Sequence, residues 1–262
     1  MDHEPQLAQS DLHCQLSADT RIVLIGLGGI GGAVLQYLAL FLHHLQLPLR
    51  LVLVDGDKYQ PRDSARQTFG TLGNKAEVKA RETLDLLPES QLTIVPLPEY
   101  VGLENIGRVI KAGDHVLLCV DNHPTRKMVA DHCHTLADVV LLSGGNDGIE
   151  PPDQRGTYGN VQIAIRQAGR DATAPLTRFH PELAQPQGSL PGDLSCGELV
   201  QSVPQILFTN LAVASAMLSA YFAYLCGRLH YQEVQLDILE ARMLPLFPIK
   251  PESLWQSATV DA

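Results

Sequence analysis

Short apolar runs alternate with amphipathic segments along most of the chain. Continuous runs of Ile, Val and Leu are typical of buried parallel strands, and they predict strands at residues 21–26, 49–55, 92–98, 115–121 and 138–145. The segments between them predict helices over residues 30–44, 75–87, 102–112 and 125–136. This alternation predicts an α/β fold: a Rossmann-like, doubly wound and mostly parallel sheet.

The pattern changes in the second half of the chain. We expect one more strand near residues 160–166, and a long crossover loop over residues 167–200, which hold four prolines and few apolar runs. The expected organisation is therefore an N-terminal flexible arm, a Rossmann-like domain, the crossover loop, and a C-terminal helix with antiparallel strands that completes the same domain, at residues 1–20, 21–166, 167–200 and 201–262.

One long segment, residues 203–227, carries no formal charge. Its length suits a membrane-spanning helix. It nevertheless contains Gln205, Thr209 and Asn210, and no basic cluster flanks it. We therefore interpret it as a core helix or a subunit interface and expect no membrane contact.

Composition narrows the functional classes. The 262 residues carry a formal net charge of −10, which argues against non-specific nucleic-acid binding. The five cysteines form no CxxC motif, so reduced thiols and a cytoplasmic protein fit best. The polar N-terminus does not resemble a signal peptide.

A metal site at His132, Cys133 and His134 is disfavoured, since helix side chains two positions apart diverge.

A glycine-rich turn is the first candidate binding element. Gly26, Gly28 and Gly31 form G-x-G-x-x-G between a predicted strand and helix, a context that permits a tight turn, phosphate approach and close helix packing. No Lys-Ser/Thr follows, so the loop is not a Walker A motif. Asp55 ends the second predicted strand, where a carboxylate binds ribose hydroxyls. Both NAD and ATP contain such a ribose, so these residues leave hydride transfer and nucleotide cleavage open.

Charged residues after the second and fourth strands favour ATP. Arg66, Lys75 and Asp121 are expected at the carboxyl edge of the sheet, around one crevice. Two cations and a carboxylate fit a triphosphate and its Mg²⁺. An NAD-dependent oxidoreductase leaves all three without a role, although His123 could serve it as an acid or base.

Several ordered motifs resemble those of a known family. The segments VLIGLGGIGG, VLVDGD, ARQ, GNKAEVKA and CVDNHPTR resemble the adenylating enzymes typified by ThiF, MoeB, HesA and the E1 ubiquitin-activating enzymes, over about residues 20–145. The resemblance implies that residues 21–166 form an ATP-binding adenylation domain. It implies activation of the C-terminal carboxylate of a ubiquitin-like or sulfur-carrier β-grasp protein, with release of pyrophosphate, and it implies a homodimer.

The resemblance also implies residue roles. It places Gly28 and its neighbours at the phosphates and Asp55 at the ribose. It assigns catalytic roles to Arg66 and Lys75 on the phosphate chain and to Asp121 as the Mg²⁺ ligand. The whole candidate nucleotide site comprises Gly26, Gly28, Gly29, Ile30, Gly31, Asp55, Asp57, Arg66, Gln67, Lys75, Asp121 and Asn122.

The chain departs from the family pattern in its loop and its arm. Asp63 stands where the family has Asn, and residues 1–20 lack the arginine that family dimers supply to the partner's triphosphate, a role left to Arg62. A degenerate, non-catalytic scaffold is therefore a further alternative. The paired CxxC motifs of the family are absent, so no structural zinc is expected.

A cysteine is the last candidate. Some family members carry the activated protein as a thioester, and Cys196, in the predicted crossover loop, is the candidate catalytic thiol. Its neighbours Asp193 and Glu198 argue against a lowered thiol pKa.

Overall fold

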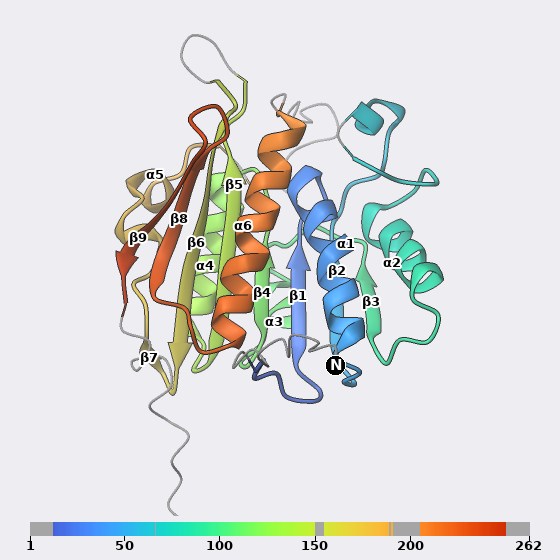
Figure 1. Cartoon of the computed structure of the whole chain (residues 1–262), viewed down its shortest axis with the longest axis horizontal. Coiled ribbons are helices and arrows are strands. Elements are labelled where there is room, and N and C mark those ends of the chain that lie inside the picture. Colours follow the sequence, from blue (N-terminus) through green and yellow to red (C-terminus); the bar gives the residue numbers. More distant parts are fainter. Residues whose placement is uncertain (1–12, 66, 150–154, 189, 191–204, 250–262) are drawn as a thin grey trace, which may run out of the picture.

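A computed structural model describes residues 13–65, 67–149, 155–188, 190 and 205–249. Within them a nine-stranded sheet carries helices on both faces (Figure 1). The elements in chain order are β1 (Arg21–Ile25), α1 (Gly29–His44), β2 (Arg50–Val54), the 3₁₀ turn η1 (Pro61–Ala65), α2 (Lys75–Leu86), β3 (Thr93–Leu97), α3 (Ile106–Val109), β4 (His115–Leu118), α4 (His123–Thr135), β5 (Val139–Asn146), β6 (Tyr158–Gln167), β7 (Arg170–Asp171), the 3₁₀ turn η2 (Leu176–Arg178), α5 (Pro181–Ala184), α6 (Leu207–Leu225), β8 (Tyr231–Asp237) and β9 (Arg242–Pro248).

The sheet is parallel in its first half and antiparallel in its second. Its order is β3-β2-β1-β4-β5-β6-β8-β9, and β7 pairs with the end of β6. Strands β3, β2, β1, β4 and β5 are parallel to one another, whereas β6, β8 and β9 are antiparallel to their neighbours. The predicted Rossmann-like fold class with an antiparallel C-terminal extension is confirmed.

Alternate residues of each strand supply two separate cores. On β1, Ile22 and Leu24 belong to the core beneath α1, α2 and α6, while Val23 and Ile25 belong to the core beneath α3 and α4. Because successive strand residues point to opposite faces, a strand buried on both sides must be apolar throughout, as the Val- and Ile-rich runs are.

Helix α6 lies beside α1 and runs antiparallel to β4 (Figure 1). Tyr221 Oη lies 2.8 Å from His115 Nδ1 at the start of β4, and Met217 Sδ lies 3.6 Å from Cys119 Sγ just beyond its end. The N-terminus of α6 is therefore at the carboxyl edge of the sheet.

Helix α6 is long and apolar enough to cross a membrane, judged by length and composition alone. Over 18 of its residues the mean hydropathy is 1.3, and half of these residues are buried inside the protein. Its contacts with α1, β5 and β6 are those of a core helix.

Three segments differ from the sequence prediction or add to it. The helix predicted over residues 102–112 is limited to α3. The Asn105 side chain accepts the Gly102 amide and donates to the Tyr100 carbonyl, and these hydrogen bonds stabilise a turn before the helix. The described part of residues 167–200 holds β7, η2 and α5. The described part of the arm lies against α6, where the Gln15 amide donates to the Leu225 carbonyl at 2.7 Å.

Candidate functional site

The glycine-rich turn leaves a helix N-terminus open at the carboxyl edge. Gly26 has φ +86°, a conformation that favours glycine, and a Cβ at Gly31 would lie 1.8 Å from the Gly26 carbonyl oxygen. A Cβ at Gly28 would meet nothing within 4 Å. Gly28 is also the N-cap of α1 and offers no side-chain cap. The first amides of α1 therefore face space in which an anion can bind.

Asp55 ties the end of β2 to this turn. One carboxylate oxygen accepts the Leu27 amide at 2.7 Å, and the other accepts the Asp57 amide at 2.8 Å. Burial raises the pKa of Asp55, while Lys75 and the Leu27 amide oppose this shift. Each oxygen keeps a second lone pair, so a ribose hydroxyl can still donate to this carboxylate.

Lys75 and Asp57 meet at the neighbouring strand end. Lys75 is buried, and its Nζ lies 3.0 Å from Asp57 Oδ2. Tyr100 also donates to the Asp57 carboxylate. Burial acts to raise the pKa of Asp57, but Lys75 and Tyr100 hold that pKa below its usual value. The pair keeps a cation at the sheet edge.

Asn74 fixes this arrangement and was missed by sequence reasoning. Its Oδ1 caps α2 by accepting the amides of Ala76 and Glu77, and its Nδ2 donates to the carbonyls of Asp55 and Asp57 at 2.9 and 3.1 Å. The signal was present, because Asn directly before a helix is a preferred N-cap.

The acidic residue after β4 is open to solvent. Asp121 is exposed, and no hydrogen bond to its carboxylate occurs among residues that the structure describes. Asn122 instead caps α4, where its Oδ1 accepts the Thr125 amide at 2.9 Å. One free carboxylate fits Mg²⁺, which keeps several waters and takes its other ligands from phosphates.

Arg126 is a further residue that sequence reasoning missed. Its buried guanidinium donates to the carbonyls of Val120 and Gly144, at 3.0 and 2.7 Å, and so joins the ends of β4 and β5. A Cβ at Gly145 would lie 1.7 Å from Arg126 Nη2, so glycine is needed there. Burial lowers the pKa of Arg126, while Cys119 and Asp121 act to raise it. Its only signal was its place at the end of the motif CVDNHPTR.

Several expected site residues cannot be placed. Arg66 and Cys196 lie outside the described residues, and nothing is described of the Arg62 side chain. Their roles stay predictions. The loop between β2 and α2 is held by Asp63, whose Oδ2 accepts the Gln60 amide at 2.9 Å, and Gln67 follows with its Oε1 buried.

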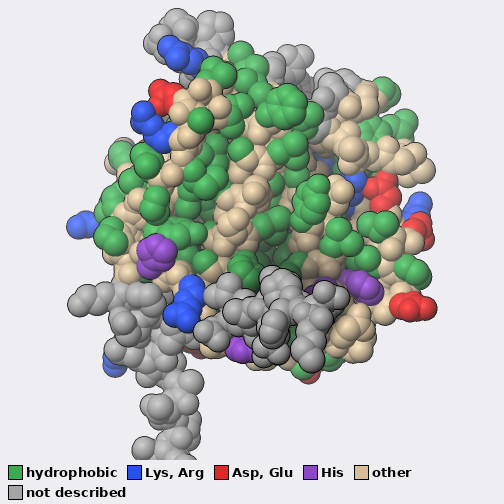
Figure 2. Space-filling view, in the orientation of Figure 1, with side chains coloured by type: hydrophobic (Ala, Val, Ile, Leu, Met, Phe, Trp, Pro, Cys, Tyr) green, Lys and Arg blue, Asp and Glu red, His purple; other side chains and the backbone are tan. Residues whose placement is uncertain are grey.

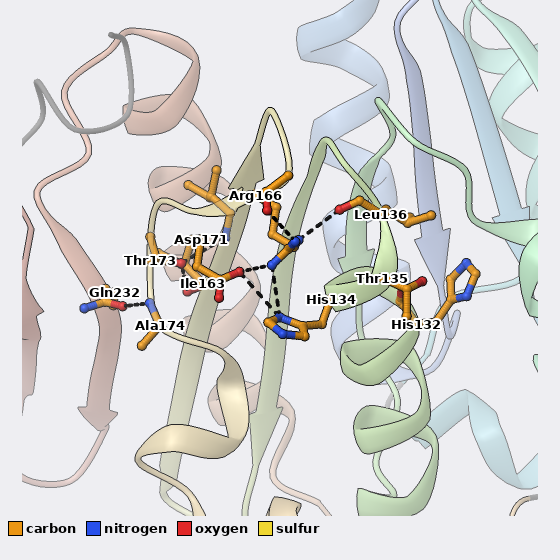
Figure 3. A network of polar contacts seen from close by, with 12 residues as sticks. His132, His134, Thr135, Leu136, Ile163, Arg166, Asp171, Thr173, Ala174 and Gln232 are labelled. Carbon is orange, nitrogen blue, oxygen red and sulfur yellow. Dashed lines mark hydrogen bonds and ion pairs between the residues drawn. The ribbon is translucent and has the colours of Figure 1, made fainter. Parts of the chain in front are cut away.

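The histidines of α4 lie at the opposite, amino edge of the sheet. His132 Nε2 lies 3.1 Å from the Ile110 carbonyl, whereas His134 contacts Arg166 and Asp171, and the two rings point apart (Figure 3). Arg166 also donates to the Leu136 carbonyl at 2.9 Å. Among the described residues, no group of three or more His, Cys, Asp or Glu could hold a metal ion.

The fold and the turn define an α/β protein with a Rossmann-like sheet and a glycine-rich β1–α1 connection. The chain belongs to the ThiF family, whose model matches residues 6–244.

Two curated relatives are similar over a large part of the chain. A molybdopterin-synthase adenylyltransferase of Escherichia coli K12 is 28% identical over 169 residues, which are 63% of this chain and 62% of that protein. A SAMP-activating enzyme E1 of Haloferax volcanii is 31% identical over 203 residues, 76% of this chain and 72% of that protein. The match thus spans about three-fifths of the bacterial relative's length.

A solved structure shares the fold. A crystal structure of E. coli MccB with MccA-N7isoASN superposes with a TM-score of 0.63 at 14% identity, over 88% of this chain and 65% of that one. At this identity the likeness concerns the fold alone.

Proposed function

We propose that this protein binds ATP with Mg²⁺ at the carboxyl edge of the sheet and adenylates the C-terminal carboxylate of a ubiquitin-like or sulfur-carrier protein. One observation carries the proposal: the uncapped N-terminus of α1, the buried Lys75 and the Asp121 carboxylate, which has no hydrogen-bond partner within the described ranges, follow neighbouring strands β1, β2 and β4 at one edge. Family membership and the adenylyltransferase name of the bacterial relative support adenylation over hydride transfer.

The chemistry needs alignment and charge neutralisation more than proton transfer. A C-terminal carboxyl group, with a pKa of roughly 3.5, is already ionised at neutral pH and needs no general base. Its oxygen attacks the α-phosphorus, and the bond from that phosphorus to the β-phosphate oxygen breaks, so that acyl adenylate and pyrophosphate form. The α1 amides and Lys75 are suited to hold the phosphates in line and to neutralise the leaving group. Asp121 would hold Mg²⁺, whose positive charge would offset the negative charge of the phosphates.

ATP–pyrophosphate exchange tests this function. The wild-type protein with its acceptor is expected to exchange labelled pyrophosphate into ATP in a Mg²⁺-dependent manner, and Asp121→Ala is expected to abolish this exchange while it leaves the fold intact. Asp131→Ala on the exposed face of α4 is the matched control. Unchanged exchange in Asp121→Ala would remove the metal assignment. ATP binding without exchange, in the presence of an acceptor that binds, would instead favour the non-catalytic scaffold.

The same proposal includes a homodimer. Hydrophobic side chains gather over α1 and α6 on the face shown in Figure 2. Tyr37, Leu40, Phe208, Leu211 and Phe222 are all exposed, with Phe208 at 68%. Phe41 and Phe222 join the two helices edge to face at 6.0 Å. An apolar face on adjacent helices suits a two-fold interface with a second copy of the chain.

A further inference from the structure

Asn210 places a buried, unpartnered amide against the N-terminus of α1. The side chain is 0% exposed, and neither Oδ1 nor Nδ2 has a hydrogen-bond partner among residues that the structure describes. A Cβ at Gly29 would lie 2.2 Å from Asn210 Nδ2, so the amide lies directly beside the first residue of α1. A buried amide without a partner costs folding free energy, which points to a ligand.

Asn146 brings a second amide to the same region. It is the last residue of β5, and both of its amide atoms are buried and without a partner in the described part of the chain. A Cβ at Gly144 would meet Met217 and Val213 of α6. Alternate strand residues share a face, so Asn146 lies on the α6 side of the sheet like Gly144, two residues nearer the carboxyl edge.

The direction of α6 brings the two asparagines to one edge. Asn210 precedes Val213 by about one helical turn, and the N-terminus of α6 is at the carboxyl edge. The sheet order puts β5 and β2 on opposite sides of β1. The amides therefore approach the start of α1 from the side opposite Lys75.

The hydrogen-bonding capacity of the pair selects a class of ligand. Each Asn amide has donors on Nδ2 and an acceptor on Oδ1. A phosphate or carboxylate at neutral pH offers only acceptors and would leave both Oδ1 atoms unpaired. A peptide group offers one N–H and one C=O, so it can donate to one Oδ1 and accept from the Nδ2 donors.

We propose that Asn146 and Asn210 bind the last peptide group of the acceptor's C-terminal segment, and thereby hold its carboxylate against the phosphate at the N-terminus of α1. This inference rests on the proposed adenylation. The acceptor segment approaches along the carboxyl edge, past the end of β5 and the N-terminus of α6, from the side opposite the cation. The subsite recognises only the backbone of the acceptor, so it accepts any C-terminal residue whose side chain does not obstruct the approach.

The probe is a mixture of synthetic pentapeptides with free C-terminal carboxylates, compared with the same mixture methylated on the last peptide nitrogen. Peptide-dependent pyrophosphate release from Mg-ATP is measured. In the wild-type protein, methylation is expected to lower the rate at least about tenfold, as expected for one lost hydrogen bond. In Asn210→Ala and Asn146→Ala, the rate with unmethylated peptides falls at least about tenfold. In the variant that lacks the asparagine accepting the peptide N–H, methylation then changes the rate less than about twofold.

Two further measurements separate a binding role from a structural one. The ATP dissociation constant of both variants is expected within about twofold of wild type, since the phosphate contacts remain. Their thermal midpoints are expected at or above wild type, because an unpaired buried amide is removed. The matched control is Asn160→Ala at the same edge: Asn160 pairs with Gly145 and so lies on the opposite face of the sheet from Asn146.

The outcomes distinguish this inference from the function on which it rests. Equal release with both peptide mixtures, no peptide-dependent release, or a lowered midpoint in the variants would overturn the peptide subsite. Failure of the wild-type protein to bind ATP would overturn the proposed function itself.

Discussion

Lys75 and Asp57 form an ion pair at 3.0 Å between the start of α2 and the loop after β2. The ammonium group is buried while Asp57 stays partly exposed, so the lysine is held at the sheet edge by a partner that solvent can reach. The triphosphate can compete with Asp57 for this cation because both are anionic oxygen groups. The Asn74 cap keeps α2 in place during such an exchange.

Lys75→Met tests the cation. The variant is expected to bind Mg-ATP about 10-fold to 100-fold more weakly, the usual range for a lost charge-assisted hydrogen bond, and to keep the wild-type circular dichroism spectrum. Calorimetric titration measures the affinity. The matched control is Lys127→Met, which removes a lysine from the exposed Lys127–Asp131 pair on α4. Equal affinity in Lys75→Met and wild type would exclude Lys75 from the phosphate site.

Two glycine-to-alanine substitutions, at Gly31 and at Gly32, test the geometry of the glycine-rich turn. Gly31→Ala is expected to destabilise the protein and to abolish ATP binding, because its Cβ would lie 1.8 Å from the Gly26 carbonyl oxygen. Gly32→Ala meets only the Leu27 carbonyl oxygen at 3.8 Å, so it is expected to be tolerated and to stabilise α1 by up to about 1 kcal/mol. Urea unfolding with ATP titration checks both. A stable, ATP-binding Gly31→Ala protein would show that the turn is not closed as described.

His180 predicts a pH dependence of stability. Its Nε2 lies 2.7 Å from Glu233 Oε2 and its Nδ1 lies 2.8 Å from Glu182 Oε1. The hydrogen bond to Glu233 raises the pKa of His180 above 6.5, against the effect of burial, and Glu182 adds to the rise. The folded-state pKa is higher than the unfolded one, so this contribution to stability is complete below pH 6.5 and is lost as pH rises through the folded-state value.

Unfolding free energies measured between about pH 5 and 8 check this dependence. His180→Gln is expected to flatten the pH profile over this window. A His180→Gln profile as steep as that of wild type would show that the Glu233 contact does not control the titration.

Phe208 tests the proposed dimer. Phe208→Glu places a charge on the exposed face of α6 and is expected to convert a dimer into a monomer. Leu239→Glu is the matched control, since Leu239 is 73% exposed at the turn between β8 and β9. Sedimentation equilibrium measures the mass. A monomeric wild-type protein, or a dimeric Phe208→Glu variant, would contradict the proposed interface.

The sequence predicted the parallel half of the sheet well because local pattern and burial agree there. Runs such as residues 21–26 are apolar on both faces, and a glycine turn marks the end of the strand, so type and boundary are both local properties. A helix was predicted over residues 102–112, but the short length of α3 was not, because the side-chain hydrogen bonds of Asn105 set its start and an apolar pattern does not report them.

The positions of three charged residues at one sheet edge were predicted from the sequence, whereas the asparagines and Arg126 were missed. Asp55, Lys75 and Asp121 follow strand ends, so strand prediction alone brings them to one edge. Asn210 is 89 or more residues away from them in the sequence, and only the direction of α6 over the sheet brings its amide to Gly29. Arg126 was missed for a related reason, since its partners are backbone carbonyls that carry no sequence signal.

Calorimetric titration of the wild-type protein with Mg-ATP and, separately, with NAD tests the central claim most directly. The account predicts that Mg-ATP binds and NAD does not, because the open helix N-terminus, Lys75 and Asp121 suit a triphosphate with its metal ion. Binding of NAD without binding of ATP would contradict adenylation and would assign the glycine turn to a redox cofactor.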